Sequence, residues 1–144
     1  MSEVYISGTE KNVDLIKQVA DKLIERHHSI CGNALWDNPE KTLSNIINAD
    51  IAIFIMAKRD NRFLTREVTQ NVLVELGIAV GSGKLTIVVG KAEGARIINH
   101  PWVRRMGLQE LLDYISSNRH LDYIPPTQVN AVEEKERTDR EEKL

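Results

Sequence analysis

The sequence predicts a doubly wound α/β domain, with a central parallel β-sheet and helices on both of its faces. The segments Ile51–Met56 and Leu85–Val89 are continuous apolar runs, typical of strands that are covered on both faces. Segments with helical periodicity alternate with the strands, which favours right-handed βαβ connections. The 144 residues are enough for one such domain with a proper core.

The first third of the chain alternates strand and helix twice. Val4–Ser7 is rich in β-favouring residues and is followed by Gly8, so it predicts a strand. Apolar residues recur at helical spacing over residues 12–26, which predicts an amphipathic helix. Ser29–Cys31 is a weak second strand. A short helix is expected over Pro39–Asn48, because proline is favoured at the first helical position.

The remaining elements continue this order after the strand at Ile51–Met56. A helix is expected over residues 67–80, with Gly81-Ser82-Gly83 at its end, before the strand Leu85–Val89. Residues 91–106 are expected to be irregular or to contain a short helix. Leu108–Ser116 is the last predicted helix.

The end of the chain differs in composition from the rest. It is almost purely polar from Pro125 onward, and charges of both signs dominate from Glu133 to Lys143. We therefore expect one domain over residues 1–124 and a charged tail over 125–144. The tail is expected to be disordered, with a charged helix paired to a partner as the alternative.

Several classes of function are not expected from composition. The net charge of −2 gives no overall field for binding nucleic acid. The start of the chain lacks the features of a signal peptide, and the apolar runs are too short to span a bilayer. The single cysteine, Cys31, cannot form an internal disulfide framework. These observations predict a cytoplasmic protein that binds neither membranes nor nucleic acid.

Two apparent motifs are set aside. Gly77–Lys84 looks like a P-loop, but its spacing is wrong, Leu85 replaces the required hydroxyl residue, and the segment leaves a helix rather than a strand. The four histidines lack metal-binding spacing, so no metal site is expected. His27 and His28 are placed at the end of the first helix, where positive charge suits the helix dipole.

Glu75 is an acidic residue in the otherwise apolar stretch 70–79, and a buried carboxylate is costly unless it is solvated, paired or functional. On the expected helix, Asn71, Glu75 and Ile78 share one side, while an apolar set faces the core. We expect Glu75 near the first turns of this helix, at the edge of the sheet where ligands bind in α/β folds. An exposed glutamate on the helix flank is the alternative.

The turn formed by Ser7, Gly8 and Thr9 lies between the first strand and the first helix. Glycine allows close backbone approach, and hydroxyl and helix-terminal N–H groups bind anions at such turns. Simple N-capping by Thr9 or Asn12 is the alternative.

Four further side chains are weaker candidates for ligand contacts. Asp60 and Arg66 lie in the polar loop that follows the strand at Ile51–Met56. Trp36 and Trp102 have rings that can stack on a base, but burial in packing is the favoured role for each.

The segment Gln70–Gly77, with the pattern Gln-Asn-Val-x-x-Glu-Leu-Gly, resembles the core motif of TIR-like nucleotide-binding domains of bacterial defence proteins. The wider layout is similar to that of nucleoside 2-deoxyribosyltransferases and nucleotide N-glycosidases. It shares a small-residue turn at 6–9, Ala49-Asp50 before a buried strand, and Lys84 entering the next strand. The similarity covers residues 4–116 and implies a flavodoxin-like or TIR-like fold.

This resemblance implies that the target is an N-glycosidic bond and that Glu75 is the catalytic carboxylate. The substrate or ligand would be NAD or a related nucleotide, with no separate cofactor. Ser7, Gly8 and Thr9 would shape the ribose or phosphate pocket, and Asn71 would order the loop or contact the ligand. A carboxylate suits this role because breaking the bond builds positive charge on the sugar.

Departures from the related families leave alternatives. Deoxyribosyltransferases usually carry an aspartate where Thr42 stands and Gly-Thr where Gln70-Asn71 stands, which favours the TIR-like branch. A deoxyribosyltransferase or a deoxynucleotide N-hydrolase is one alternative. A non-catalytic nucleotide-sensing or protein-interaction module is another. The resemblance also implies a homo-oligomer.

Overall fold

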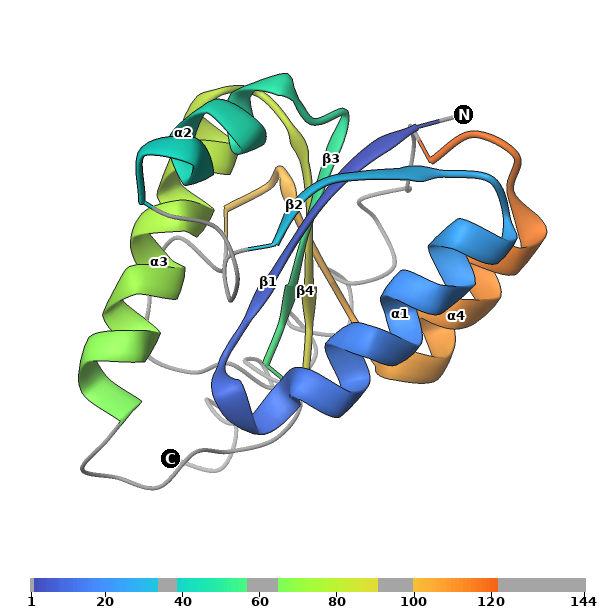
Figure 1. Ribbon diagram of the computed structural model, residues 1–144, viewed down its shortest axis with the longest axis horizontal. Coiled ribbons are helices and arrows are strands. Elements are labelled where there is room, and N and C mark those ends of the chain that lie inside the picture. The colour runs from blue at the N-terminus through green and yellow to red at the C-terminus, as the bar shows by residue number, and fades with distance from the viewer. Residues whose placement is uncertain (1, 34–38, 57–64, 91–99, 122–144) are drawn as a thin grey trace, which may run out of the picture.

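The computed structural model describes residues 2–33, 39–56, 65–90 and 100–121 (Figure 1). In chain order, the elements are β1 (Glu3–Gly8), the 3₁₀ turn η1 (Glu10–Asn12), α1 (Val13–Glu25), β2 (Ser29–Asn33), α2 (Pro39–Asn48), β3 (Ile51–Ile55), α3 (Thr65–Gly81), β4 (Leu85–Val89), β5 (Val103–Met106) and α4 (Leu108–Ser117). The domain boundary at 124 and the tail at 125–144 lie outside the described residues.

The five strands form one parallel sheet in the order β2-β1-β3-β4-β5. α1 and α4 cover one face of this sheet, and α2 and α3 cover the other (Figure 1). The predicted doubly wound α/β fold is therefore confirmed. β2 follows β1 in the chain and lies on one side of it, whereas the later strands β3, β4 and β5 lie on the other side. The strand order therefore reverses at β1, and the topological switch point lies between β1 and β3.

The strand β5 corrects, for residues 103–106, the expectation that residues 91–106 are irregular or contain a short helix, while residues 91–99 lie outside the described part. Val103–Met106 pairs with β4 in parallel, with Val103 opposite Thr86 and Met106 opposite Val89. Two of its four residues are arginines, so it lacks the apolar run that marks a central strand. Among the described strands β5 pairs only with β4, and a terminal position in a sheet tolerates half-exposed polar side chains.

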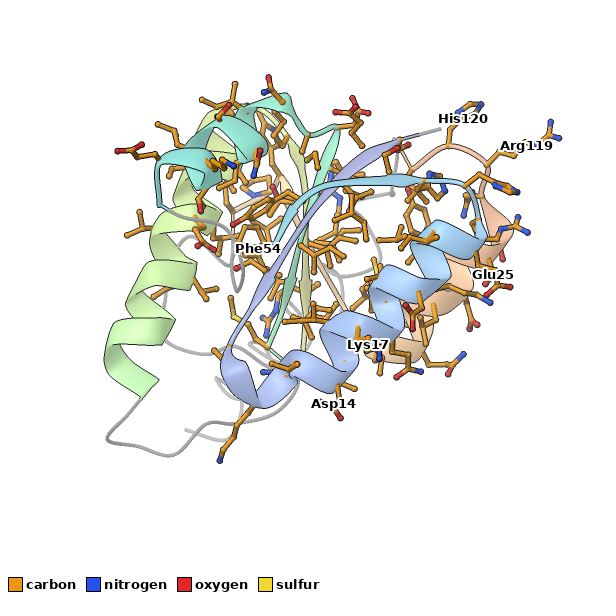
Figure 2. All side chains as sticks on the ribbon, in the orientation of Figure 1. Asp14, Lys17, Glu25, Phe54, Arg119 and His120 are labelled. Atoms are coloured by element: carbon orange, nitrogen blue, oxygen red, sulfur yellow. The ribbon has the colours of Figure 1, made fainter. Side chains whose placement is uncertain are left out.

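Two buried apolar clusters fill the layers on either side of the sheet, because successive strand residues point to opposite faces. The cluster under α1 and α4 contains Val4, Ile6, Ile16, Val19, Leu23, Ile51, Ile53, Ile55, Ile87, Val89, Leu111, Ile115 and Leu121. The cluster under α2 and α3 contains Tyr5, Ile46, Ala49, Ala52, Phe54, Val72, Leu76, Ala79, Val80, Val88 and Val103. Figure 2 shows Phe54 in the layer between the sheet and α3.

Two helices end in the same hydrogen-bonded turn, the Schellman motif. At the end of α3, Lys84 N–H donates to the Ala79 carbonyl and Gly83 N–H to the Val80 carbonyl, with Gly83 at a φ of +73°. Gly83 thus ends a helix as predicted, and the segment is not a P-loop. α1 ends in the same way, with His27 at a φ of +66°.

His28 differs from the prediction that both histidines at the end of α1 carry positive charge. Its side chain is buried, and Nδ1 accepts a hydrogen bond from the Ser2 backbone N–H at 3.1 Å. Burial is the main cause that lowers the pKa of His28, and nearby positive groups lower it further. His28 is therefore a neutral, buried histidine, whereas His27 is exposed.

Within the described residues, no helix combines the length and the apolar character needed to cross a membrane.

Candidate functional site

The centre of the candidate site is a hydrogen bond between β1 and α3. Ser7 Oγ donates to Glu75 Oε2 at 2.5 Å. Ser7 is fully buried near the end of β1, and Glu75 is partly buried on α3. The structure thus brings together two of the residues that the sequence singled out, which are 68 positions apart in the chain.

The surroundings of Glu75 disfavour its charged form. Burial is the largest influence and raises the pKa of Glu75, while hydrogen bonding from Ser7 and a weaker contact with Tyr5 act against that rise. Among the described residues, no neighbouring charge contributes to the shift. The carboxyl group is thus poorly hydrated and fixed in orientation, and no described cation neutralises it.

Tyr5 is a member of the site that the sequence interpretation missed. It lies on the same side of β1 as Ser7 because the two are separated by two positions in a strand. Its side chain interacts with the Glu75 carboxyl group and lowers the pKa of that group. Its ring packs against Phe54 at a centroid distance of 6.3 Å. The sequence did carry a signal for this, because side chains alternate between the two faces of a strand and Tyr5 and Ser7 therefore share one face of Val4–Ser7.

The position of Glu75 along α3 corrects the expectation that it lies in the first turns. α3 begins at Thr65, so Glu75 is ten residues further on, which is about the third turn. The site still lies near the carboxyl ends of the strands, because Ser7 is the residue before the last of β1 and pairs with Phe54 of β3. This is the switch point between β1 and β3, where ligands bind in doubly wound folds.

Gly8 and Thr9 are explained by local packing. A Cβ atom at Gly8 would lie 2.6 Å from the Ile55 carbonyl oxygen and 3.0 Å from Ile16 Cδ1, so glycine is required by the close approach of β1 to β3 and α1. Thr9 is buried, and its hydroxyl accepts a hydrogen bond from Asn12 Nδ2 at 2.6 Å. Asn12 precedes α1 but makes no side-chain capping hydrogen bond, so the alternative of N-capping by Asn12 is wrong. Ligand contacts by Gly8 and Thr9 remain predictions.

The other predicted contacts fall outside what the structure describes. Asp60 and Trp36 lie outside the described residues. Arg66 and Asn71 lie on the backbone of α3, but their side chains are outside the described part. The structure therefore brings together Ser7 and Glu75 of the predicted residues.

Trp102 is exposed, so the prediction that it is buried in packing is wrong. It is 54% exposed, and its ring meets that of His100 edge-on at 5.3 Å. It immediately precedes β5, so it lies at the amino edge of the parallel sheet, whereas Ser7 lies near the carboxyl edge. Trp102 is therefore on the wrong edge to stack on a base beside Glu75.

This arrangement presents a carboxyl group of defined orientation in a poorly hydrated place. A carboxylate there interacts more strongly with developing positive charge than one in water, because few water molecules compete with it. Stabilising a cationic carbon centre, or adding to it, is the chemistry available to such a group.

Comparisons with known proteins agree with this architecture. No family model matches the chain, and no curated protein matches it. Among solved structures, the CMP N-glycosidase BcmB of Clostridium botulinum is similar, with a TM-score of 0.58 and 19% identity over 81% of this chain and 99% of that chain. A flavodoxin from the domain Archaea has a TM-score of 0.47 and 12% identity, over 80% of this chain and 94% of that one. At this identity, the similarity to BcmB concerns the fold.

Proposed function

We propose that the protein is a nucleotide N-glycosidase that cleaves the bond between base and sugar in NAD or a related nucleotide. The observation that carries this proposal is the Glu75 carboxyl group, partly buried and held by Ser7 at the switch point of the sheet. The similarity in fold to a CMP N-glycosidase supports it. The resemblance of the Gln-Asn-Val-x-x-Glu-Leu-Gly pattern at residues 70–77 to nucleotide-binding domains is a second, independent support.

The proposed reaction breaks the bond between C1′ and the base nitrogen, and the electron pair leaves with the base. Positive charge then develops on C1′ and the ring oxygen, as in other glycoside cleavages. The ionised Glu75 carboxylate stabilises this charge or adds to C1′ through one oxygen. Water finally supplies a hydroxyl group to C1′, and Glu75 is regenerated. The proton of that water goes to a base that leaves as an anion, such as cytosine, and is released to solvent when nicotinamide leaves as a neutral molecule. No cofactor is needed.

The contacts of Glu75 fit this role. Ser7 donates to Oε2, which fixes the carboxyl plane and leaves Oε1 as the oxygen to face the sugar. Burial raises the pKa of Glu75, which marks a carboxylate with weakened hydration. Such a carboxylate gains more from an approaching cationic centre than a fully hydrated one does.

The first experiment offers the protein NAD, CMP and a panel of 2′-deoxynucleosides and their monophosphates, with free base detected by chromatography. Release of base from one class, and its loss in Glu75→Gln, is the expected result. The mass of the protein in solution is measured alongside, because an oligomer is expected and a site completed by a neighbour would be inactive in a monomer.

A matched control separates the role of Glu75 from a general effect of the substitution. Glu110 is an exposed glutamate in the first turn of α4, on the other face of the sheet, so Glu110→Gln should leave the rate unchanged. If no substrate releases base, or if Glu75→Gln releases base as fast as the parent, the enzyme proposal is wrong. Tight nucleotide binding by calorimetry without turnover would instead support a sensing module.

A further inference from the structure

We infer that Ser2, His28, Ser29 and Leu121 form a pH-sensitive clip that fastens the segment after α4 to the starts of β1 and β2. The Ser2 N–H donates to His28 Nδ1 at 3.1 Å, and the Ser2 carbonyl accepts from the Ser29 N–H at 3.0 Å. The Ser2 hydroxyl oxygen accepts from the Leu121 N–H at 3.3 Å. The backbone N–H, the carbonyl and the hydroxyl oxygen of Ser2 are thus all engaged.

The clip is buried although it consists largely of polar groups. Ser2 is 6% exposed, His28 5% and Leu121 1%. The Leu121 side chain belongs to the apolar cluster under α1 and α4, so the clip also holds an apolar residue in the core. Hydrogen bonds in such a place are costly to lose, because water does not readily replace them.

The clip requires a neutral His28. Because Nδ1 accepts the Ser2 N–H, it carries no proton, and the remaining hydrogen of the neutral ring is on Nε2. Nε2 is buried and has no hydrogen-bond partner among the described residues. Protonation would add a hydrogen to Nδ1, which would then face the hydrogen of the Ser2 N–H. It would also bury a positive charge that no described acceptor stabilises.

The titratable and charged groups around His28 all oppose its protonation when they carry positive charge. They come from each neighbouring element: Arg26 and His27 at the end of α1, His120 after α4, and the terminal amine before β1. Among the described residues, no carboxylate contributes to the shift. Figure 2 shows Arg119 and His120 beyond the end of α1, at this edge of the molecule.

The direction of the pH effect follows from the lowered pKa of His28. Burial and these charges keep its pKa below its ordinary value of 6.5, so an opened clip binds the proton more readily than a closed one. The clip therefore keeps its full stability above that value and weakens as pH falls toward the lowered pKa. Below the lowered pKa the loss of stability is complete, and Leu121 leaves the core more often than at neutral pH.

The clip is independent of the proposed catalytic site. Ser2 precedes β1 and Ser29 begins β2, so the clip lies at the amino edge of the sheet, whereas Ser7 and Glu75 lie near the carboxyl edge. An acid-induced release is thus a change in how the chain after α4 is held, with no direct contact to the carboxyl group.

Amide hydrogen exchange measured by NMR tests this inference on the full chain. Protection factors, corrected for intrinsic rates, are compared at about pH 7.5 and about pH 5.5, on either side of the ordinary histidine pKa. The Leu121 and Ser29 amides should lose protection as pH falls. The loss is up to about tenfold per pH unit between the ordinary pKa of histidine and the lowered pKa of His28. The Ile53 amide, in the central strand β3, should keep its protection.

Exposed histidines provide matched controls. His28→Gln should remove the pH dependence of Leu121 protection, whereas His27→Gln and His120→Gln should retain it. If His28→Gln does not fold, titration of the His28 ring in the parent protein decides, with a pKa below 6.5 and concurrent loss of Leu121 protection expected. Titration of His28 at or above its ordinary value, or constant Leu121 protection during titration, overturns the inference.

Discussion

Replacing Ser7 by alanine removes the hydroxyl group that holds the Glu75 carboxyl. The bond is 2.5 Å long and joins a fully buried donor to a partly buried acceptor. Hydrogen bonds to charged groups contribute about 1.5–3 kcal/mol, and bonds between neutral groups about 0.5–1.5 kcal/mol. Ser7→Ala should therefore lower the free energy of unfolding by about 2 kcal/mol while Glu75 is ionised.

A double-mutant cycle isolates the contribution of the charge. Glu75→Gln keeps the shape and an acceptor oxygen, so Ser7→Ala in that background should cost only about 1 kcal/mol, which leaves a coupling energy of about 1 kcal/mol. Urea unfolding of the four proteins at neutral pH, with unchanged m-values, measures this energy. Equal costs of Ser7→Ala in both backgrounds would refute the proposed charge-assisted bond.

The pH dependence of the same cycle gives a second measurement. Because the pKa of Glu75 is raised on folding, protonation stabilises the folded protein, and that stability is lost as pH rises through the raised pKa. Glu75→Gln should therefore be more stable than the parent at neutral pH. In acid, where Glu75 is protonated, the cost of Ser7→Ala in the parent should fall to its value in Glu75→Gln.

The remaining predictions concern activity, packing and a helix end. The kcat/KM of the proposed reaction should fall as pH drops through the raised pKa of Glu75, and Tyr5→Phe should shift this limb to higher pH, because Tyr5 lowers that pKa. In thermal unfolding, Gly8→Ala should lose about 1–3 kcal/mol of stability, because its Cβ would lie 2.6 Å from a backbone oxygen of β3. Gly81→Ala, whose Cβ meets nothing within 4 Å, should gain up to about 1 kcal/mol, which serves as its control. His27→Gly should stabilise the protein in chemical unfolding by about 0.5–1 kcal/mol, since His27 has a φ of +66°, and His27→Ala should not.

The sequence predicted the elements whose local signals agree with their packing. The helix Pro39–Asn48 has the expected bounds, with proline at its first residue, and the apolar runs of β3 and β4 are central strands. The strand predicted most weakly, Ser29–Cys31, is confirmed, since β2 begins at Ser29 and extends two residues beyond Cys31. β5 escaped prediction because a short outer strand with two arginines has no apolar run.

The candidate site was harder to predict because its contacts join distant parts of the chain. Spacing alone left Glu75 equally compatible with an exposed helix flank, and only the meeting of β1 with α3 shows its bond to Ser7. Tyr5 and His28 were missed for the same reason. A buried tyrosine resembles any core residue, and the charge of a histidine depends on neighbours such as Ser2 that sequence does not place.

The alternation of side chains along β1 has a consequence for how this protein tolerates evolutionary change. Tyr5 and Ser7 face α3, whereas Val4 and Ile6 face α1 and α4. Residues of the layer under α1 and α4 lie on the opposite face of the sheet from the Glu75 carboxyl group, so conservative substitutions there do not contact it. A one-residue insertion or deletion before Tyr5 would instead exchange the two faces and place the hydroxyl groups in the wrong layer. We therefore expect homologues to keep the length of β1 constant and to replace residues of that layer only by apolar residues of similar volume.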